Sequence, residues 1–123
     1  MTYILALTKL ATVNMQFPNK ALDTASRLLR TMSNPSRLLV LCELLDGERS
    51  VGELARRTSL SQSALSQHLA KLRAQGLVAT RRQSQNIFYS LADTDVGQII
   101  ALLHRLFCAA DLKPKHRRKA KRR

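Results

Sequence analysis

The sequence predicts a mainly α-helical domain that carries one small β-hairpin, and three observations predict it. A helix with a capped start is expected over residues 50–57. A second helix is expected over 61–75 and is closed by Gly76. Two short runs of β-forming residues follow, 77–82 and 87–91, around a polar turn at 83–86. Helix, turn, helix and hairpin, in this order, form a winged helix-turn-helix.

Each of the two helices starts at a capping residue. Ser50 precedes the first helix, and Glu53 follows it at the spacing of a capping box. Ser61 can accept hydrogen bonds from the free amides that start the second helix. That helix places three leucines on one face, which predicts the side that packs on the core: Leu65, Leu69 and Leu72.

The opposite face of the second helix is small, polar and free of acidic residues. It consists of Ser63, Ser66, Gln67 and Ala70. Such side chains can enter the major groove of DNA and hydrogen-bond to base edges, whereas an ordinary solvated face more often carries Glu and Lys. Further residues complete the predicted DNA contacts, several of them suited to phosphates: Gln62, His68, Lys71, Arg73, Arg81 and Arg82.

The hairpin is built from β-formers, with Arg81 and Arg82 beside a turn that contains no acid. A basic hairpin can lie over the sugar-phosphate backbone or enter the minor groove. The alternative is a structural hairpin with two solvated arginines. Because the hairpin directly follows the second helix, we favour the DNA-binding interpretation.

Length and charge favour one DNA-binding domain. The chain has 123 residues, of which 45% are hydrophobic, and no Trp, so an aliphatic core is expected. The net charge is +13, and removing the eight basic residues of 113–123 leaves +5 for 1–112. We expect an N-terminal extension (1–18), a DNA-binding and dimerisation domain (19–112) and a disordered basic tail (113–123). The tail either adds salt-dependent attraction to nucleic acid or is solvated without a specific role.

Helices are expected on both sides of this region. One covers 21–32, and the next begins at Asn34-Pro35, has Leu38, Leu41, Cys42 and Leu45 on one face, and ends at Asp46-Gly47. The last helix, 93–110, carries two apolar faces: Val96, Ile99, Ile100, Leu103, Leu106 and Phe107 on one, and Gly97, Ala101, Cys108 and Leu112 on the other. Two such faces predict a homodimer through the terminal helices, which suits a palindromic DNA site.

Several of these motifs together resemble the ArsR/SmtB family of bacterial repressors. They span residues 20 to 110, and the matching runs are Met32–Arg37, Ser50–Leu54, Leu60–Leu69, Leu72-Arg73, Gly76–Val78 and Ile87–Tyr89. The resemblance implies a dimeric winged helix that alters its contact with a double-stranded DNA operator when it senses an inducer. No membrane span or secretory signal is found, so a cytoplasmic location is expected.

The chain departs from the metal-sensing members of that family. Their thiolate site needs a Cys-x-Cys pair, but only Cys42 occurs before the helix pair. Their other site needs two ligands per protomer on the last helix. Asp93, Asp95 and His104 are present, but Arg105 and Phe107 occupy the positions after His104. We therefore predict no metal and no cofactor, with a metal-responsive repressor as the alternative.

Cys42 and Cys108 remain as sensor candidates. Two cysteines without a signal peptide indicate a reducing compartment, where a switching disulfide is possible and a structural one is not expected. From the residues alone, two thiols that act as small hydrophobes are the simpler interpretation. The sequence, however, most resembles the sulfide- and redox-responsive BigR, SqrR and HlyU type. That resemblance implies that oxidation bridges the two cysteines by a disulfide or a polysulfide.

Other classes of protein fit the sequence less well. A thiol enzyme needs a base beside a low-pKa cysteine, and although His104 lies one turn before Cys108, no nucleophile motif is present, so no enzyme is predicted. An RNA-binding or architectural basic protein would leave the polar helix face without a use. A regulator that has no cysteine switch and acts by displacing another DNA-binding protein stays open.

Overall fold

The computed structural model describes residues 17–108. The chain divides into two compact units, residues 1–30 and 31–123. In the first unit, α2 (Asn19–Met32) begins, and Asp23 and Arg27 form an ion pair one turn apart at 2.6 Å. The helix ends inside the second unit, where Met32 is buried. Most of the predicted N-terminal extension and the whole predicted basic tail lie outside the described residues.

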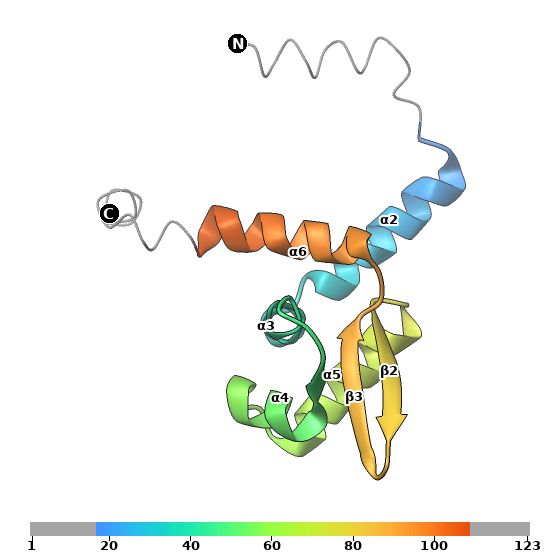
Figure 1. Cartoon of the computed structure of the whole chain (residues 1–123). Coiled ribbons are helices and arrows are strands. Elements are labelled where there is room, and N and C mark those ends of the chain that lie inside the picture. The colour runs from blue at the N-terminus through green and yellow to red at the C-terminus, as the bar shows by residue number, and fades with distance from the viewer. Residues whose placement is uncertain (1–16, 109–123) are drawn as a thin grey trace, which may run out of the picture. The chain divides into compact units, whose positions relative to one another are not determined.

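The second unit contains the remaining elements: α3 (Pro35–Glu43), β1 (Arg49–Ser50), α4 (Val51–Thr58), α5 (Gln62–Ala74), β2 (Val78–Gln83), β3 (Asn86–Leu91) and α6 (Thr94–Phe107). The strands form an antiparallel sheet in the order β1-β3-β2. Within this unit α6 lies above α3, and the β2–β3 hairpin extends beside α4 and α5 (Figure 1). The predicted winged helix-turn-helix is confirmed.

The helix starts also agree with the sequence. The Asn34 side chain accepts from the Arg37 amide at 3.0 Å, and Pro35 occupies the first turn of α3. The Arg37 guanidinium donates through Nε to the Thr31 carbonyl at 2.6 Å, which satisfies an acceptor in the last turn of α2. One arginine therefore joins the end of α2 to the start of α3.

The end of α3 differs from the sequence prediction. The helix stops at Glu43, before the predicted end at Asp46-Gly47, because the amides of Leu44 and Leu45 bond three residues back to Leu41 and Cys42 at 3.1 Å. Such short bonds tighten the last turn and turn the chain away from the helix axis.

The buried face of α3 is also rotated from the predicted one. The fully covered side chains are Val40, Leu41 and Leu44, whereas the predicted Leu38, Cys42 and Leu45 are half-buried. The reason is that α3 packs against α4, α5 and α6 together, so side chains around most of its circumference meet neighbours. A prediction from the spacing of apolar residues places only one side of the helix against the core, so it missed this wider burial.

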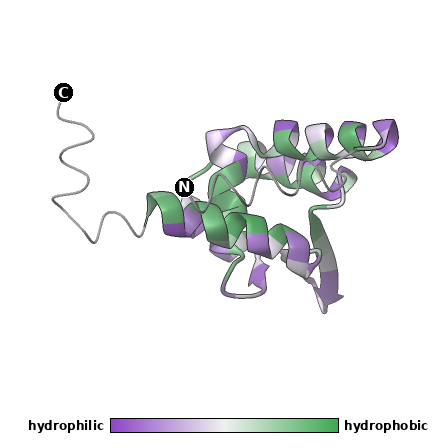
Figure 2. Ribbon diagram, turned by 90° about the horizontal axis from the view of Figure 1, so that it is seen from above, coloured by the Kyte–Doolittle hydropathy of each residue, from purple (hydrophilic) through white to green (hydrophobic). Residues whose placement is uncertain are grey.

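The core of this unit is aliphatic, as composition predicted. Its buried hydrophobic side chains beyond α3 are Leu54, Leu65, Leu69, Leu72, Leu77, Val78, Val96 and Ile100. The hairpin begins at this core and becomes polar toward its turn (Figure 2). None of the helices within residues 17–108 is long and apolar enough to cross a membrane.

The last helix is only partly buried. It begins after its N-cap Asp93, whose side chain accepts from the Val96 amide at 3.0 Å, and its predicted end at 110 lies outside the described residues. Val96 and Ile100 of the predicted apolar stripe are buried, whereas Leu106 and Phe107 are 55% and 70% exposed. The second half of α6 thus leaves large apolar side chains uncovered.

Candidate nucleic-acid interface and thiol pair

A reciprocal capping box fixes the start of α4. The Ser50 hydroxyl accepts from the Glu53 amide at 3.1 Å, and the Ser50 amide donates to the Glu53 carboxylate at 3.0 Å. This bond from the Ser50 backbone, aided by Arg49 and Arg56, lowers the pKa of Glu53. The predicted capping box is confirmed, and it ties α4 directly to β1, which ends at Ser50.

The turn between α4 and α5 is held by Thr58 and Ser59. The buried Thr58 hydroxyl donates to the Leu54 carbonyl at 2.6 Å and accepts from the Leu60 amide at 3.3 Å. Ser59 then takes a left-handed conformation with φ of 60°, which ends α4. Ser61 follows as the N-cap of α5 and accepts from the Ala64 amide at 3.1 Å. The turn is short and well bonded, so the angle between the two helices is fixed locally.

The two faces of α5 are separated as the sequence predicted. Leu65, Leu69 and Leu72 are buried. The opposite side, which we call the reading face, is exposed: Ser63, Ser66, Gln67 and Ala70. Of the predicted flanking contacts on α5, Gln62, Lys71 and Arg73 are exposed and His68 is half-buried. Their contacts with DNA stay a prediction, but all except His68 present their side chains to solvent.

A groove adjoins the reading face. It has a volume of about 460 Å³ and lies between α5, the first residue of α4 and the hairpin. Its lining consists of Val51, Ser66, Leu69, Ala70, Arg73, Ala74 and Tyr89. The sequence placed Tyr89 in the hairpin and in a run shared with the family, but did not predict that it lines a groove. Its place in the β3 alternation could have indicated that it faces α5.

The two hairpin arginines lie within β2, which extends one residue further toward the turn than predicted. The turn is correspondingly short and uses Ser84, whose φ is 59°. The Arg81 guanidinium forms two hydrogen bonds with the Glu48 carboxylate, at 2.7 and 2.8 Å. Arg82 is exposed, and within residues 17–108 the structure shows no ion pair for it. The two arginines are therefore not equivalent.

An ionic network connects α3 to the helix pair. The Arg57 guanidinium on α4 donates to the Glu43 carboxylate at 2.5 Å, and this hydrogen bond raises the pKa of Arg57. Arg49 of β1 donates through Nε to the Glu43 carbonyl at 2.7 Å. Glu43 is the last residue of α3 and the neighbour of Cys42. The end of α3 is thus bonded to both α4 and β1, and no local pattern of residues predicts these bonds.

The two thiols differ in exposure. Cys42 on α3 is half-buried, whereas Cys108 is exposed at the end of α6. Burial raises the pKa of the Cys42 thiol, and the charges of Cys108 and Glu43 raise it further. The two cysteines belong to helices that pack against each other, α3 and α6.

No metal centre is formed by the described part of the chain. Among residues 17–108, no group of three or more His, Cys, Asp and Glu side chains could hold an ion. The exposed His104 and the N-cap Asp93 lie at opposite ends of α6.

An acid-free polar helix face beside an arginine-bearing hairpin defines a winged helix-turn-helix of the DNA-binding class. Residues 34–80 match the model of the bacterial regulatory protein, arsR family. Over 101 residues the chain is 54% identical to the transcriptional activator HlyU of Vibrio cholerae, covering 82% of this chain and 94% of that protein. The chain belongs to the ArsR family.

Other relatives and solved structures agree with this assignment. The biofilm growth-associated repressor of Xylella fastidiosa is 41% identical over 92 residues, which cover 75% of this chain and 81% of the repressor. Reduced HlyU from Vibrio cholerae superposes with a TM-score of 0.70 at 57% identity, over 73% of this chain and 95% of that one. BigR from Xylella fastidiosa superposes with a TM-score of 0.66 at 42% identity, over 74% of this chain and 90% of the BigR chain. These relatives are transcriptional regulators, not enzymes.

Proposed function

We propose that this chain is a DNA-binding transcriptional regulator that inserts α5 into the major groove of a palindromic operator as a homodimer. The observation that carries the proposal is the reading face. It is exposed and contains no carboxylate, and it is held rigidly by the three buried leucines on the other side of α5. Small and amide side chains on such a face can approach base edges without repelling phosphates.

The homodimer rests on the uncovered end of α6. Leu102, Leu106 and Phe107 are 43%, 55% and 70% exposed. Clustered exposed apolar side chains mark interaction sites, and a second copy of the same helix supplies a matching apolar surface. Such a dimer presents two α5 helices, which suits two half-sites about 34 Å apart on one side of the DNA.

Regulation in this proposal uses the two cysteines. With a peroxide, the exposed Cys108 thiolate attacks the O–O bond and becomes a sulfenic acid, and Cys42 then displaces water to form the disulfide. With a persulfide, Cys108 accepts the outer sulfur and releases a thiol. Cys42 then attacks the Cys108 sulfur and releases hydrogen sulfide. In both routes the two thiols supply the two electrons. A solved relative is described as reduced HlyU, which supports a redox-dependent state in this family.

A bridge at Cys42 would act on DNA binding through Glu43. Movement of this residue displaces the carboxylate that binds Arg57 of α4 and the carbonyl that binds Arg49 of β1. Both elements lead directly into the helix pair, so a shift at the end of α3 changes the angle of α5 and the spacing of the two reading faces. The covalent bridge therefore lowers operator affinity although neither thiol touches DNA.

The binding proposal is tested by selecting duplexes from a random-sequence pool with the reduced protein. We expect a palindrome whose half-sites lie about one helical turn apart, bound at least about 1,000-fold more tightly than unselected duplex at physiological salt. We call this DNA the selected duplex. Recovery of no common sequence would instead support the architectural alternative. The sign of regulation follows from where the site lies, and relatives named as an activator and as a repressor both occur.

A further inference from the structure

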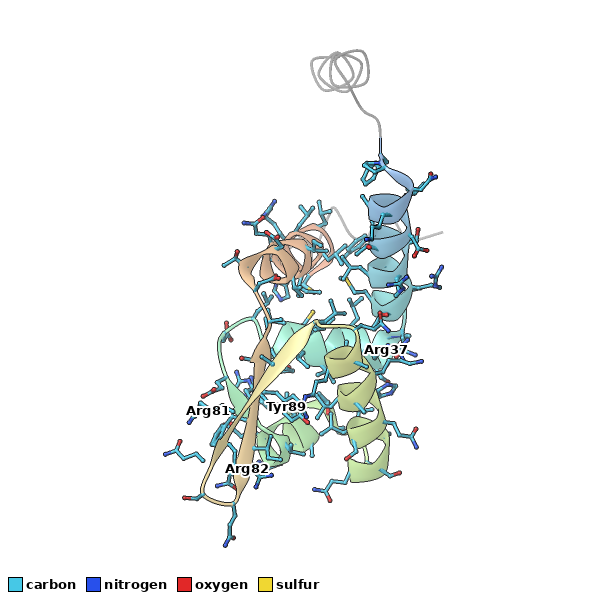
Figure 3. All side chains as sticks on the ribbon, turned by 90° about the vertical axis from the view of Figure 1, so that its right-hand side faces the viewer. Arg37, Arg81, Arg82 and Tyr89 are labelled. Atoms are coloured by element: carbon cyan, nitrogen blue, oxygen red, sulfur yellow. The ribbon has the colours of Figure 1, made fainter. Side chains whose placement is uncertain are left out.

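The two arginines of β2 lie on opposite faces of the sheet. Arg81 pairs with Phe88 across the strands and Arg82 pairs with Ile87, and successive residues of a strand point to opposite sides. Thr80 pairs with Tyr89, which lines the groove beside α5, so this is the inner face of the hairpin. By alternation Arg82 shares this inner face with Tyr89. Arg81 lies on the outer face, on the side of the hairpin away from Tyr89 (Figure 3).

Each nitrogen of the Arg81 guanidinium is bonded to a neighbour on that outer face. Nε and Nη2 donate to the two carboxylate oxygens of Glu48 at 2.8 and 2.7 Å, and Nη1 donates to the Gln83 side chain at 2.8 Å. The guanidinium also lies 4.8 Å from the centre of the Phe88 ring. Two parallel hydrogen bonds to one carboxylate fix the orientation of the guanidinium and also strengthen the ion pair. All three nitrogens of this group already have acceptors in the free protein.

The position of Glu48 shows which parts of the fold the Glu48–Arg81 ion pair connects. Glu48 immediately precedes β1, and Ser50 of β1 pairs with Phe88 of β3. The side chains of Glu48, Phe88 and Arg81 therefore lie on one face of all three strands. The ion pair crosses β3 above Phe88 and joins β2 to the residue before β1. Because β1 continues directly into the capped start of α4, the hairpin is connected to the helix pair.

We infer that Arg81 is a positioning residue that holds the hairpin against β1 through Glu48, and that Arg82 rather than Arg81 contacts the DNA backbone. A phosphate that approached Arg81 would meet the Glu48 carboxylate, which is bonded to Nε and Nη2 and would repel it. Arg82 meets neither obstacle and lies on the face beside the groove and α5. The effect on DNA rests on the proposed function, whereas the link itself belongs to the free protein.

A charge exchange tests the link. We compare Arg81→Glu, Glu48→Arg and the variant that carries both changes, a cycle that isolates the pair from each residue's other effects. In the free protein each single change should speed amide exchange at Arg49 and Tyr89, which pair across β1 and β3, several-fold, and the double change should restore it. Exchange that is the same in all four proteins, or that the double change does not restore, would overturn the link.

Binding to the selected duplex separates the two arginines. Arg82→Met should reduce the slope of log affinity against log salt by about 1.8, because the proposed dimer loses one phosphate contact per protomer at about 0.9 each. Arg81→Met should leave the slope unchanged and lower affinity. The charge exchange should recover the affinity lost in Arg81→Glu. Equal slope reductions in the two Met variants would overturn the assignment. If wild type selects no sequence at all, the proposed function fails, and the amide-exchange result still decides whether the link exists.

Discussion

Cys42 on α3 and Cys108 at the end of α6 belong to two helices that pack against each other. Burial raises the pKa of the Cys42 thiol, and Cys108 and then Glu43 raise it further. A thiol with a raised pKa is a poor first nucleophile at neutral pH, whereas the exposed Cys108 meets oxidants directly. In the proposed switch we therefore expect Cys108 to be modified first and Cys42 to close the bridge.

The pH dependence of Cys42 alkylation tests this order. In Cys108→Ser, burial still disfavours the Cys42 thiolate, so the alkylation rate should be half-maximal above about pH 8.5, the midpoint of an ordinary cysteine. The measurement is the rate of iodoacetamide labelling against pH, with the same variant unfolded in urea as control. The folded midpoint should lie above the unfolded one. A folded midpoint at or below the unfolded one would reverse the proposed order.

The capping box should stabilise the domain measurably. Ser50→Ala removes the acceptor of the Glu53 amide and should cost about 1 kcal/mol in the free energy of unfolding. Ser63→Ala, on the exposed reading face, should cost much less. Urea unfolding followed by circular dichroism checks both variants. A loss at Ser50 no larger than the loss at Ser63 would show that the cap contributes nothing.

The lowered pKa of Glu53 adds a pH test to the same cap. The Ser50 amide stabilises the ionised carboxylate in the folded state, so this contribution is present above the ordinary glutamate pKa of about 4.3 and is lost as pH falls through the lower folded value. The stability difference between wild type and Glu53→Gln should therefore shrink on acidification below about pH 4. A difference that stays constant down to pH 3 would contradict the role of the charge.

The uncovered end of α6 should control association. Leu106→Lys places a charge in the proposed dimer interface and should weaken dimerisation by on the order of 2 kcal/mol or more. Because Leu106 is exposed in a single chain, the variant should still fold. Gln98→Lys, also exposed on α6, is the matched control and should remain dimeric. Sedimentation of both proteins gives the answer, and a Leu106→Lys dimer as stable as wild type would move the interface elsewhere.

The parts of the fold that the sequence predicted are those with local signals. Caps at Asn34, Ser50 and Ser61 and the leucine spacing of α5 are each decided within a few neighbouring residues. The two-residue strand β1 was missed because it is too short to show alternation, and it exists only through its pairing with β3. The buried face of α3 was misplaced for a related reason: three neighbouring helices cover it, and no local pattern records them.

The same distinction applies to the candidate site. The reading face of α5 follows from helical spacing, but the separation of Arg81 from Arg82 depends on a carboxylate far away in the chain, Glu48. The hydrogen bonds from Arg49 and Arg57 to Glu43 likewise join residues that are not neighbours in the sequence. A count of charged residues does not distinguish one arginine from another, so it could not show which arginines are bonded to carboxylates of the same chain.

Base recognition should depend on the centre of the reading face. Gln67→Ala removes an exposed amide that can bond to a base edge and should reduce discrimination between the selected duplex and a single-base variant by about 1–3 kcal/mol. Its affinity for unselected DNA should change little. Competition binding with both duplexes measures this, and Gln75→Ala, exposed just beyond α5, is the control. Unchanged discrimination in Gln67→Ala would move the recognition surface off this face.

The central claim is that a bond between Cys42 and Cys108 controls DNA binding, and one paired measurement tests it most directly. Wild type, Cys42→Ser and Cys108→Ser are treated with persulfide or peroxide, and each sample is divided between intact-mass analysis and binding to the selected duplex. We predict that wild type gains an intramolecular bridge and loses affinity, while both variants bind like the reduced protein before and after treatment. A Cys108→Ser protein that still loses its affinity fully on treatment would contradict the two-cysteine switch.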